Sequence, residues 1–202
     1  MGSCLASDVV RIAKGEIGYK ESGSNWTKYA KDLDAVKYFN TPKQNIAWCA
    51  TFCYWCILKA CTPKDRSDGE KKWDALYFTY QPSRDNCACG CKYGAGYFRA
   101  KGAWYSKPKV GDIVFFGSKG NETHQGIVTQ VSGNSFYTAE GNKSDKVCAC
   151  SYTLGSSTNI AGFGRPRYDA EPEPTPPTPP TPTYTAEQAM KDIEAIVKKY
   201  NG

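Results

Sequence analysis

The chain has 202 residues, of which 40% are hydrophobic and 13% aromatic, and its formal net charge is +6. This length and apolar content predict one domain with a core of its own rather than two. No run of eighteen apolar residues and no block of five Lys or Arg residues occurs, which argues against a membrane-spanning helix and a basic nucleic-acid-binding tail. The first residues lack a basic segment followed by an apolar stretch of signal-peptide length, so we expect synthesis in the cytoplasm without a signal peptide.

Apolar residues at helical spacing predict helices in the first half of the chain. A first helix is predicted over residues 7–18, with a serine as its N-cap, and a second apolar stripe runs from Trp26 to Leu33. Residues 48–61 are apolar on nearly every face, which is typical of a helix buried in the middle of a fold. We also interpret the glycine- and aromatic-rich residues 92–105 as a helix.

The periodicity changes in the second half, where short β-branched or aromatic runs are separated by Gly, Asn and Ser turns. These runs are GDIVFF, HQGIVTQV, SFYTAEG, KVCACSY and a last piece near AGFGR. Helices followed by such strands predict an α+β fold, in which N-terminal helices pack on a C-terminal antiparallel β-sheet.

The last part of the chain has a different composition. Residues 171–185 alternate Pro and Thr, which favours polyproline II and predicts a stiff spacer. The residues after it form an amphipathic stripe too short to be stable alone, so we expect this helix to dock or self-associate. The sequence thus predicts a domain over residues 1–168, a linker over residues 169–184 and a short helix over residues 185–202.

Ten cysteines are clustered rather than spaced as in a simple disulfide scaffold. Four lie within residues 49–61, three alternate in the segment CACGC at residues 87–91, and two alternate at residues 148–150. CACGC is too tight for the paired spacing of a zinc site and the chain has one histidine, although structural zinc stays an alternative. We expect most of these cysteines to be small buried apolar groups in a reducing or anaerobic setting. The pattern assigns no function to CACGC.

Two residues are candidates for nucleophilic chemistry. Cys49 lies near the start of the buried helix, where the helix dipole favours a thiolate and backbone N–H groups can face a developing oxyanion. The alternative is one more core cysteine beside Cys53 and Cys56. His124 is the only histidine and begins the run HQGIVTQV, so any histidine-dependent acid/base chemistry must use it. The alternative for His124 is an ordinary surface residue.

Two later residues strengthen the interpretation of His124. If HQGIVTQV and SFYTAEGN pair as a hairpin across residues 132–134, position 124 lies opposite approximately position 142. Glu140 and Asn142 are two residues apart and project from the same side of a regular strand, so both reach the imidazole. A carboxylate in that position fixes the tautomer and stabilises an imidazolium. Without the pairing, Glu140 would be a solvated carboxylate at the end of a strand.

Four motifs in order resemble a known family. They are WCATF at residues 48–52, GDIVFF at 111–116, HQGIV at 124–128 and YTAEGN at 137–142. Together they resemble the CHAP branch of the NlpC-type papain-like hydrolases, as found in phage and prophage endolysins. The resemblance covers approximately residues 7–168 and implies a papain-like CHAP fold for the predicted domain.

The resemblance implies cleavage of an amide bond in bacterial peptidoglycan through an acyl-enzyme. Carried over to this chain, Cys49 is the nucleophile, His124 the general base and then acid, Glu140 the orienting third residue and Asn142 an assisting polar group. Many CHAP domains have an acidic calcium loop shortly before the cysteine. Here the corresponding YFNTPKQNIAW has no carboxylate, so we expect no calcium, no other metal and no cofactor.

The first hypothesis is therefore an endolysin that is made in the cytoplasm of the bacterial host and acts on the cell wall after release. Its partner would be peptidoglycan, with no nucleic acid involved. The alternatives are a papain-like secreted effector or toxin, and a non-catalytic wall- or zinc-binding module. The short C-terminal helix would be a remnant of, or a contact to, a wall-targeting module, or a self-association element. The sequence does not distinguish an N-acetylmuramoyl-L-alanine amidase from an endopeptidase.

Overall fold

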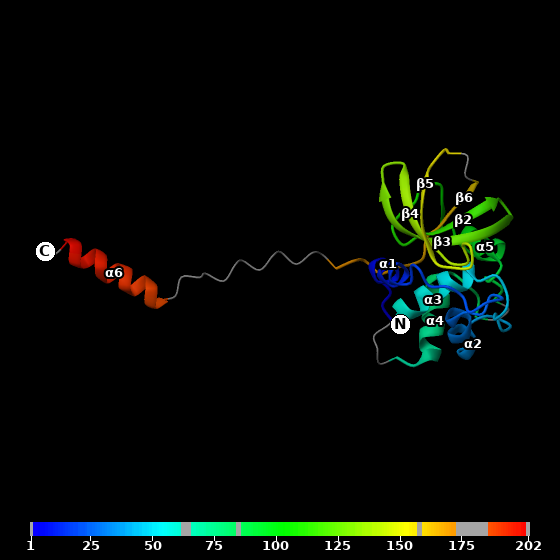
Figure 1. Ribbon diagram of the computed structural model, residues 1–202, viewed down its shortest axis with the longest axis horizontal. Coiled ribbons are helices and arrows are strands. Elements are labelled where there is room, and N and C mark those ends of the chain that lie inside the picture. Colours follow the sequence, from blue (N-terminus) through cyan, green and yellow to red (C-terminus); the bar gives the residue numbers. More distant parts are fainter. Residues whose placement is uncertain (1, 62–65, 84–85, 157–158, 173–185, 201–202) are drawn as a thin grey trace. The chain divides into compact units, whose positions relative to one another are not determined.

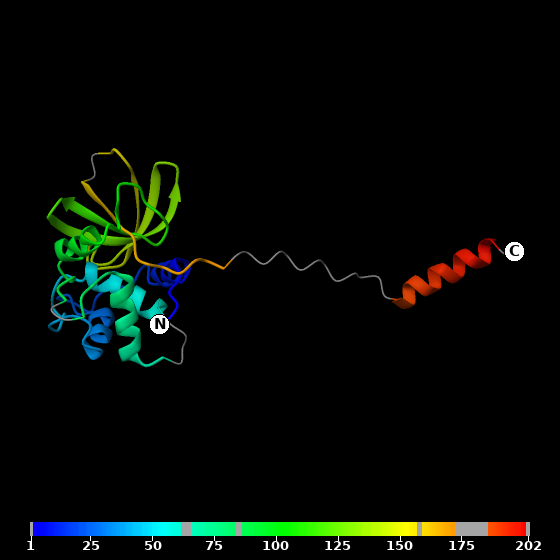
Figure 2. The ribbon, with the colours of Figure 1, turned by 180° about the vertical axis from the view of Figure 1, so that it is seen from behind.

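The structure is a computed structural model that describes residues 2–61, 66–83, 86–156, 159–172 and 186–200. The chain divides into two compact units, Met1–Glu171 and Pro172–Gly202, which we treat separately. Unit 1 combines helices with a β-sheet, and the helices gather on one side of that sheet (Figure 1 and, from behind, Figure 2). The predicted α+β class, with helices packed on an antiparallel sheet, is confirmed.

Helix α1 (Ala6–Gly15) differs from its prediction at both ends. Leu5 occupies the N-cap, so the predicted capping role of Ser7 is wrong; the N–H and hydroxyl of Ser7 instead donate to the Glu171 carboxylate. The helix also ends before the predicted Gly18, whose N–H donates to the carbonyl of Val147 (2.9 Å), the residue just before strand β5 (Cys148–Thr153). A hydrogen bond to a distant segment has therefore replaced the helical one at this end.

Helix α2 (Lys28–Ala35) is shorter than the apolar stripe that predicted it. The hydroxyl of Thr27 accepts a hydrogen bond from the Ala30 N–H (3.1 Å) and so caps the helix at its first turn. Leu33 is fully buried, whereas Trp26 precedes the helix and is 51% exposed. The inner part of the stripe is therefore confirmed, and its first residue lies outside the helix.

Helix α3 (Cys49–Ala60) is the buried helix that the sequence predicts. Every residue in it except Lys59 is buried. Two other helices already described, the later helix α4 (Asp68–Phe78) and strands β3 (Asn121–Ser132) and β4 (Ser135–Glu140) pack against it. A helix surrounded in this way needs apolar side chains on all faces, which explains its lack of a polar face.

Two further helices complete unit 1. Helix α4 (Asp68–Phe78) has no counterpart in our sequence prediction, although its start carries a recognisable capping box formed by Ser67 and Glu70. Helix α5 (Cys91–Ala100) confirms the helix expected in this region. It ends earlier than predicted because Trp104–Tyr105 forms strand β1.

One antiparallel sheet contains six strands in the order β1-β6-β2-β3-β4-β5. The five β-branched or aromatic runs of the sequence correspond to β2 (Ile113–Ser118), β3 (Asn121–Ser132), β4 (Ser135–Glu140), β5 (Cys148–Thr153) and β6 (Ile160–Gly164). Helices α1, α3 and α5 all pack on β3. This strand is thus the part of the sheet that is tied most closely to the helical layer.

Alternation along the strands gives the sheet two apolar faces. Ile113, Phe115 and Ile127 belong to the large core shared with the helices. Side chains of the opposite face build a small second cluster, made of Val114, Val128, Phe136 and Phe163. Both faces of the sheet therefore carry buried apolar side chains.

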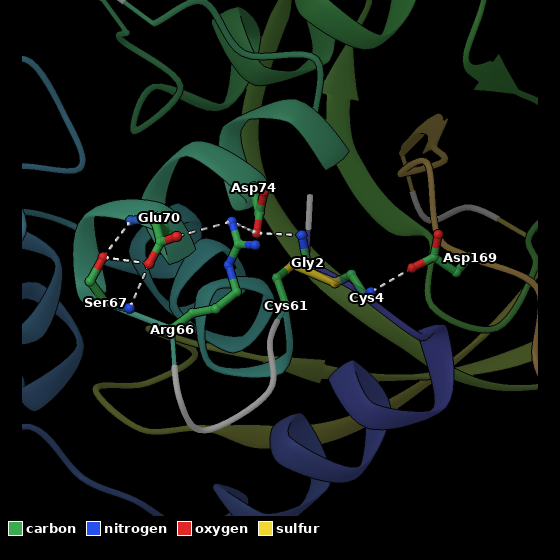
Figure 3. Close-up of polar contacts among 8 residues, drawn as sticks. All are labelled: Gly2, Cys4, Cys61, Arg66, Ser67, Glu70, Asp74 and Asp169. Atoms are coloured by element: carbon green, nitrogen blue, oxygen red, sulfur yellow. Dashed lines mark hydrogen bonds and ion pairs between the residues drawn. A yellow bond between two sulfur atoms is a disulfide. The ribbon is translucent and has the colours of Figure 1, made fainter.

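The first residues of the chain are held beside the C-terminal end of α3 by a disulfide and by hydrogen bonds (Figure 3). Cys4 forms a disulfide with Cys61, and its N–H donates to the Asp169 carboxylate (2.8 Å). The N–H of Gly2 donates to Asp74 (2.8 Å). The expectation that most of the cysteines are free does not extend to this pair, in which the fold brings together two residues 57 positions apart. The other eight cysteines are free and at least partly buried.

Unit 2 contains helix α6 (Ala186–Tyr200). Four of its apolar side chains are exposed: Met190, Ile193, Ile196 and Val197. The predicted Pro/Thr spacer lies almost wholly outside the described residues. The domain boundaries at residues 168 and 184 stay predictions. Within the described part of the chain, no helix has the length and apolar content needed to cross a bilayer.

Candidate active site

Cys49 is the first residue of α3, directly after the N-cap residue Trp48. The amide groups of a first helical turn have no partner within the helix, and with the helix dipole they favour a negative charge at this point. The indole N–H of Trp48 donates to Glu21 (2.7 Å), which anchors the entry to the helix. The Cys49 side chain is only 5% exposed.

Close packing brings the end of β4 to the start of α3. A Cβ atom at Gly141 would lie 2.5 Å from Cβ of Phe52 and 2.9 Å from the Trp48 ring. Only a glycine permits this approach, because real Cβ atoms do not come so near other heavy atoms. The residue before it, Glu140, is thereby placed beside the helix that carries Cys49.

His124 lies on β3 and pairs with Phe116 of β2. Its Nε2 is 2.9 Å from Oε2 of Glu140, the last residue of β4. Glu140 occupies Nε2, and Cys49 and His124 lie close enough to shift each other's pKa, that of Cys49 downward and that of His124 upward. The structure thus joins three of the predicted site residues, and each comes from a different element.

The Glu140 carboxylate is fully buried and fixed from several sides. It accepts hydrogen bonds from the hydroxyls of Thr138 (2.6 Å) and Tyr152 (2.7 Å), and the Lys143 ammonium lies 3.3 Å away. Gly126 makes room for it, since a Cβ at that position would be 2.6 Å from Cγ of Glu140. The sequence analysis singled out none of these supporting residues. Gly126 lies two residues after His124 in the motif HQGIV, and that motif was the signal that could have identified it.

Asn142 does not occupy the predicted position. The hairpin pairs Ile127 with Ala139 and turns after Ser132, so the expected register is right. However, β4 ends at Glu140 and Asn142 has a φ of +57°, so the regular strand assumed for both residues stops short of it. Asn142 instead lines the same cleft as His124, and no hydrogen bond joins the two among the described contacts. His124 is also inside its strand, not at its start, since β3 begins at Asn121.

The pKa values follow from these contacts. The hydrogen bond with Cys91 and the contacts with His124 hold the pKa of Cys49 well below its ordinary value, against the effect of burial. Burial lowers the pKa of His124, but its bonds to Cys49 and Glu140 raise it overall to about 9. Burial works against the charge on Glu140, yet hydrogen bonds from His124 and two hydroxyls lower its pKa to about 2. These shifts all favour the charged forms, which are a thiolate at Cys49, an imidazolium at His124 and a carboxylate at Glu140.

Cys53, one turn further along α3, is the obvious competitor for the nucleophile's role. It has no exposed surface, and burial raises its pKa well above the ordinary value. A thiol of this kind stays protonated and is a poor nucleophile. The environment therefore separates the two cysteines chemically although they lie on the same helix.

A cleft of about 430 Å³ opens beside His124. Its residues come from β2, β3, β5 and the loops around them: Phe116, Gly117, Thr123, His124, Asn142, Lys143, Ser144, Tyr152 and Asn159. Aromatic faces and amide groups of this kind suit a peptide, and Lys143 adds a positive charge. In the part of the chain that the structure describes, no group of three or more His, Cys, Asp or Glu residues is arranged to hold a metal ion.

Comparison with family models places the site in a known context. The model of the CHAP domain matches residues 37–142, which is more than half of the chain and contains Cys49, His124, Glu140 and Asn142. CHAP domains are typically cysteine-dependent amidases or endopeptidases that act on peptidoglycan. Comparison with curated proteins and with solved structures gave no significant match.

Proposed function

The chain belongs to the CHAP domain family, and on that premise we propose that it cleaves an amide bond of bacterial peptidoglycan with Cys49 as its nucleophile. The observation that carries the proposal is the line of contacts from Cys49 through His124 to the buried Glu140. A thiolate next to an imidazolium that is oriented by a carboxylate is the arrangement used for acyl transfer by cysteine hydrolases.

In the proposed mechanism the Cys49 sulfur attacks the carbonyl carbon of the amide. The oxygen that becomes negative lies toward the first turn of α3, where unpaired N–H groups can donate to it. His124 then gives its proton to the departing nitrogen, and the bond between carbon and nitrogen breaks. In the second half, neutral His124 takes a proton from water, which attacks the thioester and releases Cys49. Glu140 keeps the ring oriented and stabilises its charge throughout.

We further propose the endolysin role, in which the protein acts on the wall after release from the cytoplasm where it is made. The resemblance of its four motifs to endolysins supports this proposal. The Cys4–Cys61 disulfide is of a kind that persists in oxidising surroundings, which suits an enzyme acting outside the cytoplasm. The net charge of +6 favours adsorption to an anionic wall. A secreted effector or toxin with the same chemistry is the alternative, and the neighbouring genes would separate the two.

The test is the loss of turbidity of purified cell walls with matched variants. Cys49→Ala should abolish lysis, while Cys53→Ala, which removes a thiol from the same buried helix, should keep most of it. His124→Ala should be inactive as well, since no other histidine exists. Wild-type lysis by Cys49→Ala would show that the nucleophile is elsewhere. Mass spectrometry of the released fragments would then identify the bond: a free stem peptide indicates an amidase, and a shortened or uncoupled peptide indicates an endopeptidase.

A further inference from the structure

The segment CACGC, which the proposed hydrolysis does not explain, leads directly to the nucleophile. Its last cysteine, Cys91, is the first residue of α5. The Sγ of Cys91 lies 3.7 Å from the Sγ of Cys49, and both side chains are buried, at 6% and 5% exposure. Acyl transfer of the kind proposed needs only one thiol. A second one in contact with the nucleophile therefore calls for a separate explanation.

The two sulfurs are close to bonding distance. A disulfide has a sulfur–sulfur distance of about 2.05 Å, so the pair must approach by about 1.7 Å. Both residues are the first of their helices, and Gly90 directly precedes Cys91, so small adjustments do not have to break a helix interior. The other two cysteines of the segment contact other groups: Cys87 contacts the Tyr97 hydroxyl (3.5 Å), and Cys89 contacts the backbone oxygen of Cys87 (3.6 Å).

We propose that Cys49 and Cys91 form a site of reversible oxidative modification, at which a peroxide converts the nucleophile into a Cys49–Cys91 disulfide. This disulfide would switch the enzyme off, because the sulfur that attacks the substrate is bonded to Cys91. It would also protect that sulfur from irreversible oxidation. The inference rests on the proposed function for its consequence, but the modification itself is a property of the two thiols.

The chemistry balances in two steps. In the first, the Cys49 thiolate attacks one oxygen of hydrogen peroxide, the O–O bond breaks, hydroxide leaves and Cys49 becomes a sulfenic acid. In the second, the Cys91 sulfur attacks the Cys49 sulfur, the S–O bond breaks, and the leaving hydroxide takes the Cys91 proton and departs as water. The hydroxide of the first step takes the proton that the His124 imidazolium holds and becomes water, so the two cysteines lose two electrons in all and one peroxide is reduced to two waters. A dithiol reductant converts the Cys49–Cys91 disulfide back into two thiols by thiol–disulfide exchange.

The surroundings favour this order of events. Cys49 is the thiol whose ionised form is stabilised, by its Cys91 contact first and then by His124, and thiolates are the forms that peroxides oxidise. Cys91 stays protonated, because its hydrogen bond with Cys49 and its burial raise its pKa. Low-pKa cysteines next to a resolving thiol are the typical sites of reversible oxidation. Peroxide is small enough to reach a sulfur that a bulky oxidant would not.

The test compares the wild-type chain with Cys91→Ser, which keeps a hydroxyl near Cys49, and with Cys89→Ser, a matched change in the same segment. Each protein is treated with excess hydrogen peroxide and then with dithiothreitol, and its activity is referred to its own reduced sample. Non-reducing peptide mapping by mass spectrometry looks for a Cys49–Cys91 cross-link that lacks two hydrogens. The Cys4–Cys61 disulfide is common to all three proteins.

We expect the cross-link in wild type and Cys89→Ser, and nearly complete recovery of activity with dithiothreitol. In Cys91→Ser the oxidised Cys49 has no resolving thiol, so it should proceed to the sulfinic acid and lose all recoverable activity. Absence of the cross-link from oxidised wild type would overturn the proposal, as would equal recovery by Cys91→Ser. The cross-link requires no substrate, so it remains a valid readout even if the protein fails to lyse cell walls.

Discussion

Replacing Glu140 by Gln tests how the site keeps its charges. The substitution retains the size of the side chain and an oxygen that can accept from Thr138 and Tyr152, but removes the negative charge 2.9 Å from His124. The pKa of Glu140 falls from its ordinary 4.5 to about 2 in the fold. At about 1.4 kcal/mol for each pKa unit, this difference of about 2.5 units corresponds to at most about 3.5 kcal/mol of stability.

The sign of the pH dependence follows from the directions of the two shifts. Because the pKa of Glu140 is lowered, its contribution is fully present above pH 4.5 and is lost as the pH falls toward 2. Because the pKa of His124 is raised, its contribution is fully present below pH 6.5 and is lost as the pH rises through about 9. The stability difference between wild type and Glu140→Gln should therefore be largest between pH 4.5 and 6.5.

Activity gives a second, independent readout of the same change. In wild type the imidazolium persists to about pH 9, whereas in Glu140→Gln the pKa of His124 should move down toward 6.5, and the alkaline limb of the rate profile should move with it. Glu122→Gln is the matched control, since Glu122 is also a buried glutamate of the sheet, on β3 and not on β4, and it pairs with Arg99 instead of with His124. It should lower stability without moving that limb. An unchanged alkaline limb in Glu140→Gln would refute the role of Glu140 as the partner of the imidazolium.

Three further predictions concern the surroundings of the site. Gly126→Ala should lower the free energy of unfolding in urea by about 1–3 kcal/mol and should also lower activity. The reason is that the new Cβ would lie 2.6 Å from Cγ of Glu140 and 3.1 Å from a backbone oxygen. Wild-type stability and activity in this variant would show that the Glu140 carboxylate moves freely. Chelation by EDTA should change neither activity nor melting temperature, and a loss restored by calcium or zinc would contradict this. Deletion of residues 172–202 keeps the contact between Ser7 and Glu171 and should leave the hydrolysis of soluble fragments unchanged. It should lower the lysis of whole cells or change the mass measured by light scattering. Full lysis at an unchanged mass would show that α6 is dispensable.

Local patterns in the sequence were sufficient for much of the catalytic arrangement. The apolar run around Cys49 could only be a buried helix, and the two-residue turn after Ser132 fixed the register that brings Glu140 to His124. The error at Asn142 arose because a left-handed residue after the end of β4 leaves no trace in a period-two pattern. Regular elements were thus predictable, and the residue beyond the last regular position was not.

The contacts that were missed join segments distant in the sequence. Cys4 meets Cys61 and Cys91 meets Cys49 only because α1, α3 and α5 pack around the same strand. Cysteine spacing carries no information on such pairings, since the connectivity of many cysteines cannot be read from their order. Helix α4 is a different case, because its capping box was visible in the sequence.

The structure also explains why Cys49 is the most reactive of the three free cysteines on α3. Cys53 and Cys56 follow Cys49 on the same helix, but they lie beyond its first turn and burial raises the pKa of both. Only Cys49 combines the unpaired amides of a helix start with an interaction with His124 that lowers its pKa. Moving the cysteine by one residue would keep the helix start but would turn the side chain by about 100° around the helix axis, away from His124. Ala50→Cys in a Cys49→Ala background should therefore give a folded protein without lysis, because a thiol shifted by one position no longer faces the imidazole.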